Sequence, residues 1–296
     1  MKIISNAFLL LALICIVACK SGTGEFKTAA GYKYVVVTKG SGPVAKPEEY
    51  VFFTLTVKGD NGKILQESSN PDQLPAMQVP KSLDDVSPPN PVLEVFAKAC
   101  VGDSVIFYMP IDSLKMGASP EVAGMKHVEY IIGIKRITDK AGYDDYSKKV
   151  QEKMMEKSKV VTARFPEVEA IAKKTLEDYN AGKLQLKETP GGVKYFIHEE
   201  GTGPLGEAGK NASVQYYGML KSGESFDNSF SRGQAFQFVI DRGDVIKGWD
   251  EGLKVLKAGS KATLFIPSEL GYGKTGNAGI PGDSELIFYI EVESIK

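Results

Sequence analysis

The chain has few of the residues that build redox, metal and nucleophilic sites: its 296 residues include three cysteines, two histidines and one tryptophan. Cys15 and Cys19 lie in an apolar N-terminal segment, so Cys100 is the only thiol farther along, and no disulfide within a folded domain is expected. Cys100 lies in the pattern FAKACVGDSV, and we interpret it as a buried core residue rather than a reactive thiol. No cysteine pair has metal-ligand spacing, so we expect no metal and no cofactor.

Motifs for hydrolysis and phosphoryl transfer are absent as well. The sequence contains no GxSxG, no HExxH and no phosphate loop, because the segment GYGKTG (271–276) lacks the required spacing. His127 and His198 lie at unrelated positions, and we interpret His198, in an expected strand beside two glutamates, as a surface residue. A catalyst built on a histidine base or a cysteine or serine nucleophile is therefore not expected.

An excess of charge of one sign is also lacking. The formal net charge is −1, and removal of a signal segment that contains Lys2 leaves −2 (−1 − 1). Nucleic-acid binding requires a basic patch or stripe, so no nucleic-acid partner is expected. Beyond residue 19, no apolar run is long enough to cross a bilayer.

The one long apolar run lies at the N-terminus. It extends from Ala7 to Ala18, follows a single lysine and ends directly before Cys19. This pattern resembles a bacterial lipoprotein signal, in which the cysteine becomes the lipidated first residue, and the alternative is an ordinary signal peptide or membrane anchor. We predict a signal peptide over 1–18, lipidation of Cys19 and a flexible tether over 19–26. The expected product is an exported bacterial lipoprotein, anchored to a membrane by its lipid, namely the outer membrane facing the periplasm.

The remaining sequence repeats itself. GYKYVVVTKGSGP (31–43) lies against GVKYFIHEEGTGP (192–204), and EVFAKACVGDSVIFYMP (94–110) lies against EGLKVLKAGSKATLFIP (251–267). Two weaker matches, NGKILQESS with SGESFDNSF and EYIIGIKRI with LIFYIEVESI, keep the same order and nearly the same offset. We predict two copies of one domain, over 27–140 and 185–296.

The segment between the copies, 141–184, has no strand signal. Val150, Met154 and Val161 fall at helical spacing, and a second helical pattern follows Pro166 and ends near Gly182. We predict two charged helices that link the copies. Two roles remain open for them: a solvated spacer, or a helix pair that dimerises the protein or shapes a clamp.

Each copy has a pattern of short strands separated by turns. In the second copy YFIHEEG, ASVQYYGML, AFQFVIDRG, KATLFIP and ELIFYIEVESI are typical of strands, and only VIKGWDEGLKVL is typical of a helix. An antiparallel sheet with one helix on one face belongs to the α+β class. Trp249, the only tryptophan, is expected to project from this helix into the gap between helix and sheet.

Aromatic residues gather in the second copy. They are Tyr216, Phe226, Phe236, Trp249, Tyr272 and Phe288. Composition alone favours a hydrophobic core over a binding site for such a set. Their context, in VQYYGMLKSGESFDNS, FQFVIDRGDVIKGWDEGL and IPSELGYGKTGNAGIPGDSELIFYIEV, resembles the FKBP-type peptidyl-prolyl cis-trans isomerases over essentially all of 185–296. The resemblance implies a twisted antiparallel sheet wrapped around a short helix, with a pocket that binds a proline ring and macrolide inhibitors.

The resemblance also assigns the floor and walls of this pocket. Trp249 matches the tryptophan whose ring forms the floor, and Tyr216, Phe226, Phe236 and Phe288 match the aromatic walls. We predict that Tyr216 and Trp249 act in catalysis and that the three phenylalanines bind substrate.

Polar groups and the pocket entrance follow in the same way. Tyr272 matches the tyrosine whose hydroxyl donates to the substrate backbone, and Asp227 matches the aspartate beside the pocket, so we assign both to catalysis. Val245 and Ile246 match the pair at the pocket edge, where the isoleucine N–H receives a ligand carbonyl, and Ile280 matches a residue that overhangs the entrance. We assign these last three to substrate binding.

Two positions depart from the pattern of the family. Tyr217 stands where a threonine is common, and the loop GNAGIPGD (276–283) is one residue shorter than in some members. Both departures would alter ligand contacts without removing the pocket. Arg232 lies where a partner arginine of the aspartate is often found.

The first copy differs at nearly all of these positions. Leu55, Leu65, Gln66 and Val92 replace Tyr216, Phe226, Asp227 and Trp249, LKMGAS (114–119) replaces GYGKTG, and Tyr130 replaces Phe288. Three prolines in PPNP (88–91) predict a shortened or shifted helix. We therefore expect 27–140 to keep the fold and lack the proline pocket, with three roles open: binding unfolded chains, positioning the active domain or contacting a partner.

Two functions are compatible with these observations. The first is a peptidyl-prolyl cis-trans isomerase that acts on proline-containing polypeptides outside the cytoplasm and assists their folding. The second is a non-catalytic chaperone or assembly adaptor that binds proline-containing segments. The full aromatic set of the second copy favours the enzyme, and the altered first copy is what the adaptor predicts.

Overall fold

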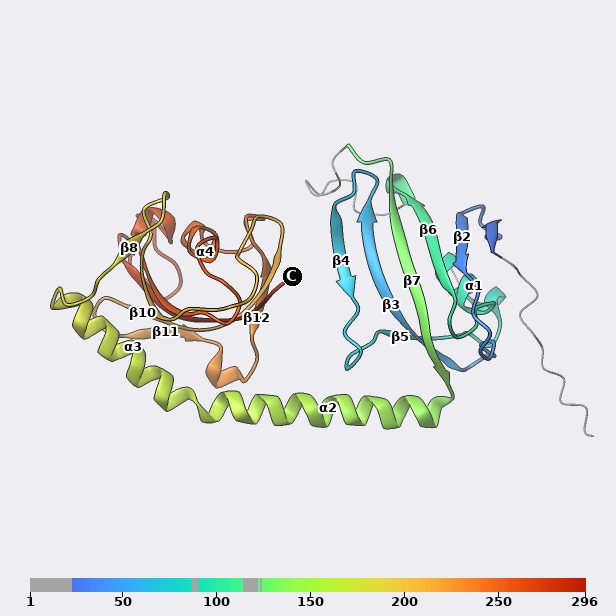
Figure 1. The fold of residues 1–296 in the computed structure, drawn as a ribbon, viewed down its shortest axis with the longest axis horizontal. Helices are drawn as coiled ribbons and strands as arrows, with labels where there is room; N and C mark the ends of the chain where they lie inside the picture. The colour runs from blue at the N-terminus through green and yellow to red at the C-terminus, as the bar shows by residue number, and fades with distance from the viewer. Residues whose placement is uncertain (1–22, 87–89, 114–121, 123) are drawn as a thin grey trace, which may run out of the picture. The chain divides into compact units, whose positions relative to one another are not determined.

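The computed structural model describes residues 23–86, 90–113, 122 and 124–296. It divides into two compact units between Gln151 and Glu152. Each unit is built on a seven-stranded antiparallel sheet with few helices (Figure 1). The predicted α+β class is therefore confirmed.

The first sheet combines short and long strands. They are β1 (Gly24–Lys27), β2 (Lys33–Thr38), β3 (Tyr50–Gly59), β4 (Ile64–Ser68), β5 (Ala76–Gln78), β6 (Ser104–Pro110) and β7 (His127–Thr138). Their order in the sheet is β1-β2-β6-β7-β3-β4, and β5 also pairs with β3. The helix α1 (Pro91–Phe96) covers one face, and the short 3₁₀ turns η1 (Leu83–Asp85) and η2 (Ile111–Ser113) belong to the loops.

The second sheet repeats this arrangement. Its strands are β8 (Lys187–Glu188), β9 (Lys194–Glu199), β10 (Asn211–Leu220), β11 (Ser225–Asn228), β12 (Phe236–Val239), β13 (Lys261–Ile266) and β14 (Leu286–Ile295). Their order is β11-β10-β14-β13-β9-β8, and β12 also pairs with β10. Read from the opposite end, this is the order of the first sheet with each strand replaced by its counterpart.

Strand register confirms the sequence match between the two copies. Tyr130 pairs with Phe107 and Val57, and Phe288 pairs with Leu264 and Gly218. Tyr130 and Phe288 therefore occupy the same place in the two sheets, as the sequence predicted.

One sequence expectation requires correction at the start of the first unit. Residues 19–26 were expected to form a flexible tether, but Gly24–Lys27 forms β1 and pairs with β2. The Phe26 ring stacks on Tyr34 with centroids 5.5 Å apart. The pairing and the buried aromatic contact order this part of the segment.

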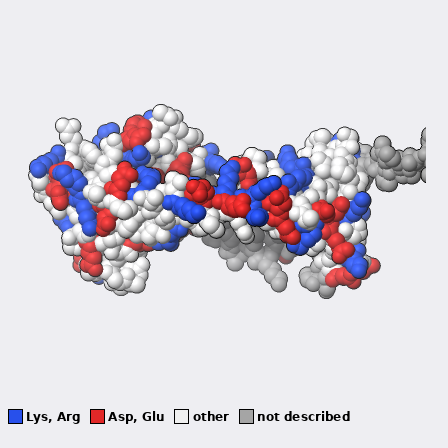
Figure 2. All heavy atoms as spheres, turned by 90° about the horizontal axis from the view of Figure 1, so that it is seen from below, with Lys and Arg blue, Asp and Glu red and all other residues white. Residues whose placement is uncertain are grey.

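Two helices follow the first sheet. α2 spans Lys140–Ala163 and α3 spans Phe165–Asn180, with Pro166 in the first turn of α3 and Gly182 at φ 66° beyond its end. The second compact unit begins within α2, at Glu152, so α3 belongs to the second unit rather than to a separate linker. Figure 2 shows acidic and basic side chains interspersed on this face of the molecule. Along α2, Lys140 pairs with Asp144 and Lys149 pairs with Asp145.

α3 packs against what we call the outer face of the second sheet. Val168, Ala172 and Leu176 of α3 are buried there. The sheet contributes Tyr217, Met219, Phe265, Ile287 and Tyr289, all at most 1% exposed. Strand alternation leaves the neighbouring residues of β10, β13 and β14 on the opposite, concave face.

The short helix α4 (Lys247–Leu253) lies in the concave face of the second sheet (Figure 1). Two glycines of α4 permit a close approach to β13, because a Cβ atom at Gly248 would lie 2.3 Å from Ile266 Cγ2 and one at Gly252 would lie 2.4 Å from Leu264 Cδ1. In the first unit, α1 has Pro91 and Val95 at the matching positions. The two helices therefore differ at the two positions that allow α4 to approach β13 closely.

The predicted lipoprotein signal, including Cys19, lies outside the described residues. In the part of the chain that the structure describes, no helix is long and apolar enough to cross a membrane. No group of three or more His, Cys, Asp or Glu side chains that could hold a metal ion occurs in that part either.

Candidate functional site

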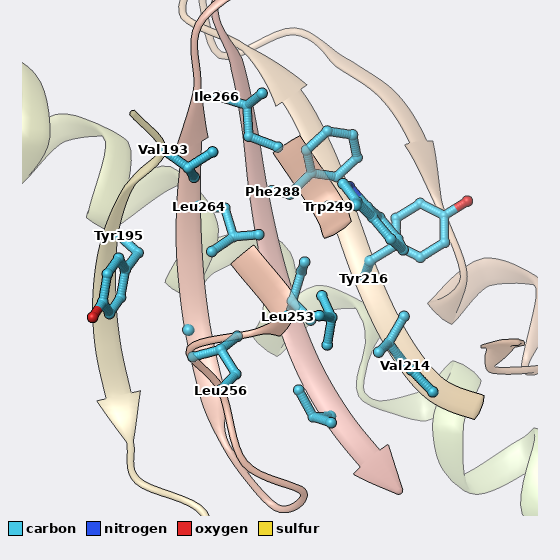
Figure 3. Close-up of a cluster of buried hydrophobic side chains, with 14 of the residues drawn as sticks. Val193, Tyr195, Val214, Tyr216, Trp249, Leu253, Leu256, Leu264, Ile266 and Phe288 are labelled. Atoms are coloured by element: carbon cyan, nitrogen blue, oxygen red, sulfur yellow. The ribbon is translucent and has the colours of Figure 1, made fainter. Parts of the chain in front are cut away.

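Trp249 lies at the centre of an aromatic cluster on the concave face of the second sheet (Figure 3). Its side chain extends from the first turns of α4 and is 4% exposed. The rings of Tyr216, Phe288 and Phe236 stand nearly perpendicular to the indole, with centroids 5.0, 5.3 and 5.9 Å away. Edge-to-face packing of this kind is the favourable geometry for aromatic rings.

The indole nitrogen of Trp249 has an unusual environment. Among the described residues, Nε1 is the only buried side-chain polar atom without a hydrogen-bond partner. The nitrogen end of the indole lies beside the Phe288 ring in Figure 3, and the two rings are perpendicular. The floor of the site is therefore formed by aromatic rings without a paired polar group of the indole.

A second aromatic pair extends the wall beyond Trp249. Phe226 of β11 meets Phe288 of β14 edge to face, with centroids 5.4 Å apart. The contact depends on Gly218 of β10, because a Cβ atom there would lie 2.8 Å from Phe288 and 2.9 Å from Phe226. Gly218 was not among the residues predicted for the site, although a glycine within a strand of apolar residues signals such a close approach.

The rim of the site is more open than its floor. Phe236 is 39% exposed although it packs against Trp249 and Phe238, which is unusual for a phenylalanine in a domain core. Val245 and Ile246 are partly buried against the same cluster, and Ile280 is 7% exposed. The backbone pair Asn277–Ile280 closes the loop that carries Ile280, with N···O distances of 2.7 and 3.0 Å.

Two hydrogen-bond donors at this rim have no partner within the described protein. The carbonyl of Ile246 accepts a bond from Trp249 N–H at 2.9 Å, while the N–H of Ile246 has no acceptor there. The Tyr272 hydroxyl also has no partner, although its ring packs against the buried cluster. An entering peptide can therefore supply carbonyl acceptors to both groups.

Tyr216, Asp227 and Arg232 form a hydrogen-bonded triangle beside the aromatic floor. The Tyr216 hydroxyl donates to Asp227 Oδ2, Arg232 Nη1 donates to Asp227 Oδ1 at 2.6 Å, and Arg232 Nη2 donates to the Tyr216 oxygen at 2.7 Å. Burial and the Asp227 carboxylate raise the pKa of Tyr216 to about 12. Burial opposes ionisation of Asp227, but bonds from Tyr216 and Arg232 outweigh it and lower the pKa of this carboxyl. The phenol is therefore neutral and the carboxylate charged at neutral pH.

Ser229, which sequence analysis did not identify, fixes the strand corner beneath this triangle. Its side chain is fully buried, accepts the Tyr216 N–H at 2.8 Å and donates to Gln215 Oε1 at 2.6 Å. Its own N–H donates to the Tyr216 carbonyl at 2.9 Å. These bonds hold β10 and the β11 end in register, which places Asp227 next to Tyr216.

Tyr217, which stands where the family commonly has a threonine, makes its contacts outside the pocket. Tyr217 is 1% exposed and lies on the outer face, where it contacts Phe165 and its hydroxyl donates to Glu169 at 3.3 Å. Because strand neighbours alternate between faces, Tyr217 points away from the site that Tyr216 lines. The residue belongs to the α3 interface, so the expected change in ligand contacts does not follow from it.

All the pocket residues predicted from the sequence thus come together around α4. Their chemistry is limited: an apolar floor and walls, unpaired donors at the rim, and one ion-paired carboxylate. His198, expected on the surface, is instead half-buried on the outer face, where its Nε2 lies 2.9 Å from Thr263 Oγ1 and its ring meets Tyr289. The site therefore favours binding and polarity effects over proton transfer.

The corresponding place in the first unit has mainly aliphatic side chains, with one tyrosine. Leu55, Leu65 and Tyr130 pack against a buried cluster that includes Ile111 and Val122. Val92, at the Trp249 position, packs with a different cluster around Phe53 and Phe96. The described residues of the first unit therefore form neither an aromatic floor nor a charged triangle at this place.

Known proteins show similarity to the second unit. Residues 204–293 match the sequence model of the family described as FKBP-type peptidyl-prolyl cis-trans isomerase. The FKBP-type peptidyl-prolyl cis-trans isomerase FkpA of Buchnera aphidicola is 44% identical over 114 residues, which cover 38% of this chain and 45% of that protein. The FkpA protein of Escherichia coli K12 is 41% identical over 128 residues, which cover 43% of this chain and 46% of that protein.

Structural similarity was found with the same relative. The crystal structure of FkpA from Escherichia coli aligns with 36% identity and a TM-score of 0.38, covering 53% of this chain and 68% of that chain. The chain spans a little less than half the length of the two curated relatives that it matches.

Proposed function

Because the second domain belongs to the FKBP-type peptidyl-prolyl cis-trans isomerases, we propose that the chain catalyses rotation about X–Pro bonds of polypeptides. The observation that supports this most directly is the aromatic site around Trp249, with free donors on Ile246 and Tyr272 at its rim. A proline ring is compact and apolar, so it can lie against such a floor while its flanking carbonyls reach the donors at the rim.

The proposed mechanism needs no nucleophile or general base. Amide resonance imposes a barrier of about 18–20 kcal/mol on rotation, and the twisted transition state loses that resonance. Its carbonyl is less charge-separated than that of the planar amide, so an apolar pocket stabilises the transition state relative to the ground state. The Ile246 N–H and the Tyr272 hydroxyl would hold the flanking backbone in the turn that rotation requires.

The Tyr216–Asp227–Arg232 triangle would orient the wall nearest the rotating bond. With the Tyr216 phenol neutral and Asp227 ionised, the triangle keeps one charge state from mild acid to pH 9, because the two pKa values move away from this range. Turnover limited by these groups is expected to be flat between about pH 5 and 9.

The first test measures isomerisation of a short X–Pro peptide, and refolding of a proline-limited protein, by the full chain. Replacing Tyr272→Phe removes one hydroxyl, and Asp227→Leu removes the carboxylate, so each is expected to lower kcat/KM by about tenfold or more. Gln66→Leu is the matched control, because Gln66 pairs in the first sheet as Asp227 pairs in the second. Trp249→Ala is a poor probe, since it creates a cavity and lowers stability as well as activity.

Unchanged turnover in both second-unit variants, with folding intact, would contradict the assigned roles. Absence of turnover in the wild-type chain, with retained binding of proline peptides, would favour the alternative function: a non-catalytic chaperone or adaptor that binds proline-containing segments. Macrolide inhibitors of the family are proposed to compete for the same pocket, and their displacement by peptide distinguishes one shared site from two.

We further propose that the chain acts outside the cytoplasm as a lipid-anchored protein that assists folding of exported polypeptides. The support is the N-terminal apolar run before Cys19, together with the short segment that precedes β1. Acylation at Cys19 would anchor the chain to a membrane, with the outer membrane facing the periplasm as the proposed location. Cys19→Ala is expected to move the protein from the membrane to the soluble fraction, and unchanged partitioning would refute lipid anchoring.

A further inference from the structure

The first unit carries a groove that the aromatic site does not explain. It has a volume of about 840 Å³ and lies at the β1, β2, β6 and β7 end of the first sheet. Its lining includes Glu25, Lys27, Tyr32, Lys33, Tyr108 and His127. The Tyr108 ring lies between a cation and an imidazole, with Lys33 Nζ 5.5 Å from its centroid and the His127 ring 5.5 Å away.

The groove lies on the face of the first sheet opposite α1. Phe107 and Met109 pack into the core with Val95 of α1, so Tyr108, between them in β6, points to the opposite face. That face has an apolar row beside the groove, because Val35, Ile106 and Ile131 lie directly opposite one another on three adjacent strands. We call this surface the outer face of the first sheet.

In the second unit, the helix α3 covers the position that corresponds to this groove. Phe265 of β13 corresponds to Tyr108 of β6, since each follows the residue that pairs with Phe288 or Tyr130. The Tyr179 ring of α3 stacks on Phe265 with centroids 4.0 Å apart. The Tyr179 hydroxyl donates to Glu285 Oε1 at 2.8 Å, and Glu285 is the counterpart of His127.

The two outer faces therefore share an aromatic residue at one position but differ in what covers it. In the second unit, the covering element is an amphipathic helix that carries an aromatic residue. In the first unit, α2 reaches only the opposite end of the sheet, where Tyr143 stacks on Tyr50 and Tyr146 meets Phe52. Tyr108 instead lines the open groove.

The charged side chains that line the groove indicate which residues a bound polypeptide would carry. Lys33 is paired with Glu25 at 2.8 Å, while Lys27 is exposed and has no ion pair among the described residues. In α3, the residues before Tyr179 are Glu177 and Asp178. Because Lys27 and Tyr108 line the same groove, a helix with carboxylates beside its aromatic residue complements both.

We propose that the outer groove of the first unit is a docking site for an amphipathic helix of a partner polypeptide, with an aromatic residue next to acidic residues. The aromatic ring stacks on Tyr108, its polar edge meets His127, and the acidic residues face Lys27. The first unit thereby binds a second polypeptide independently of the aromatic site around Trp249.

The probe for this proposal is a fluorescein-labelled peptide with the sequence of residues 165–184, which contains α3. Its binding to the full-length chain is measured by anisotropy. Tyr108→Ser is expected to weaken binding about tenfold, the value of one aromatic stack. Ile64→Ser is the matched control, because Ile64 is 54% exposed on β4 of the same unit and lies outside the groove.

A charge reversal tests the same site without risk to folding. Lys27→Glu, at an exposed position, is expected to weaken binding of the peptide several-fold, and a peptide with Glu177→Lys and Asp178→Lys is expected to recover it. Turnover of a short X–Pro peptide is expected to be unchanged in Lys27→Glu and Tyr108→Ser, so failure of the docking site is distinguishable from failure of the isomerase.

A photoreactive peptide locates the contact. With p-benzoylphenylalanine in place of Tyr179, cross-linking is expected within the segments around Tyr108, Pro110 and His127. Cross-links confined to the second unit, or no binding of the peptide, would overturn the proposal. Equal affinity for a scrambled, non-helical peptide would show that the groove binds extended chains. Loss of peptide binding together with self-association of the protein would show that a second copy occupies the groove. Either result would refute docking of a partner helix.

Discussion

At the residue scale, Trp249 determines the character of the site. The indole fills the gap between α4 and the sheet, and the perpendicular rings of Tyr216, Phe236 and Phe288 hold it in one orientation. A leucine or valine at this position, as Val92 in the first unit, cannot form a flat floor. The presence or absence of this one ring therefore separates the two copies chemically.

His198 predicts a pH dependence of stability in the second unit. Burial lowers the pKa of His198 from its ordinary value near 6.5, because the charged imidazolium is poorly solvated on the outer face. The unfolded chain then binds the proton more readily, so this contribution to stability is present above about pH 6.5 and is lost as the pH falls through the folded pKa.

The measurement is urea unfolding of the full chain between pH 7.5 and 5. In the wild type, the free energy of unfolding of the second unit is expected to decrease as the pH falls. His198→Asn is expected to reduce this slope while keeping a polar partner for Thr263. His127→Asn is the control, because its side chain is 35% exposed and lies in the first unit. An equal slope in wild type and His198→Asn would show that another group controls the acid response.

At the element scale, α4 depends on glycines that lower its intrinsic helix propensity. Gly248 and Gly252 cost about 1 kcal/mol each relative to alanine in an isolated helix, yet they allow α4 to lie directly on β13. The close approach places Trp249 at the depth where it meets Tyr216. Packing therefore outweighs propensity in this helix.

The Gly252→Ala substitution tests this balance. Its Cβ atom would lie 2.4 Å from Leu264 Cδ1, and Leu264 is fully buried, so unfolding free energy is expected to fall by about 1–3 kcal/mol despite the gain in helix propensity. In a Leu264→Ala background the obstruction is gone, and the same substitution is expected to cost little. Additive effects in this double-mutant cycle would show that the contact does not limit the approach of α4.

α3 has a role that its sequence pattern did not reveal. The expectation of a linker over 141–184 rested on helical spacing without a strand signal, but α3 buries Val168, Ala172 and Leu176 against the outer face of the second sheet. Arg164 adds two bonds to the buried Glu291, at 2.6 and 2.8 Å, and Glu291 also accepts the Tyr289 hydroxyl at 2.8 Å. The helix is therefore part of the second unit.

At the scale of the whole molecule, this packing sets the limits of a second unit that can fold by itself. A fragment of 185–296 would expose Tyr217, Met219, Phe265, Ile287 and Tyr289, which are at most 1% exposed in the chain. A fragment of 152–296 keeps the helix that covers them and matches the compact unit. The longer fragment is expected to retain full turnover and unfold cooperatively.

The shorter fragment is expected to be several kcal/mol less stable and to bind a hydrophobic dye, because large apolar side chains become exposed. Both fragments are compared by thermal unfolding, dye binding and turnover of an X–Pro peptide. Equal stability of the two fragments would mean that α3 covers the sheet without contributing to its folding.

Much of this organisation could be predicted from the sequence. The internal repeat predicted two domains of one fold, and strand register bears out the match of Tyr130 with Phe288. The aromatic spacing around Trp249 predicted which side chains meet, because alternation within a strand places Tyr216 and Gly218 on one face and Tyr217 on the other. Local periodicity and a repeated motif carry this information directly.

Only the tertiary structure decided the features that depend on contacts distant in sequence. Ser229 carries no signal in the sequence, and Gly218 signals only that some group approaches its strand closely. Which rings and strands pack around these two residues follows from the fold. The sequence predicted helices between the copies, but their pattern did not indicate which sheet face α3 covers. It also did not indicate that, among the described residues, Tyr108 lines a groove on the matching face of the first unit. A periodic pattern indicates which side of an element is apolar. The free energy of packing in the folded chain determines which other element covers that side.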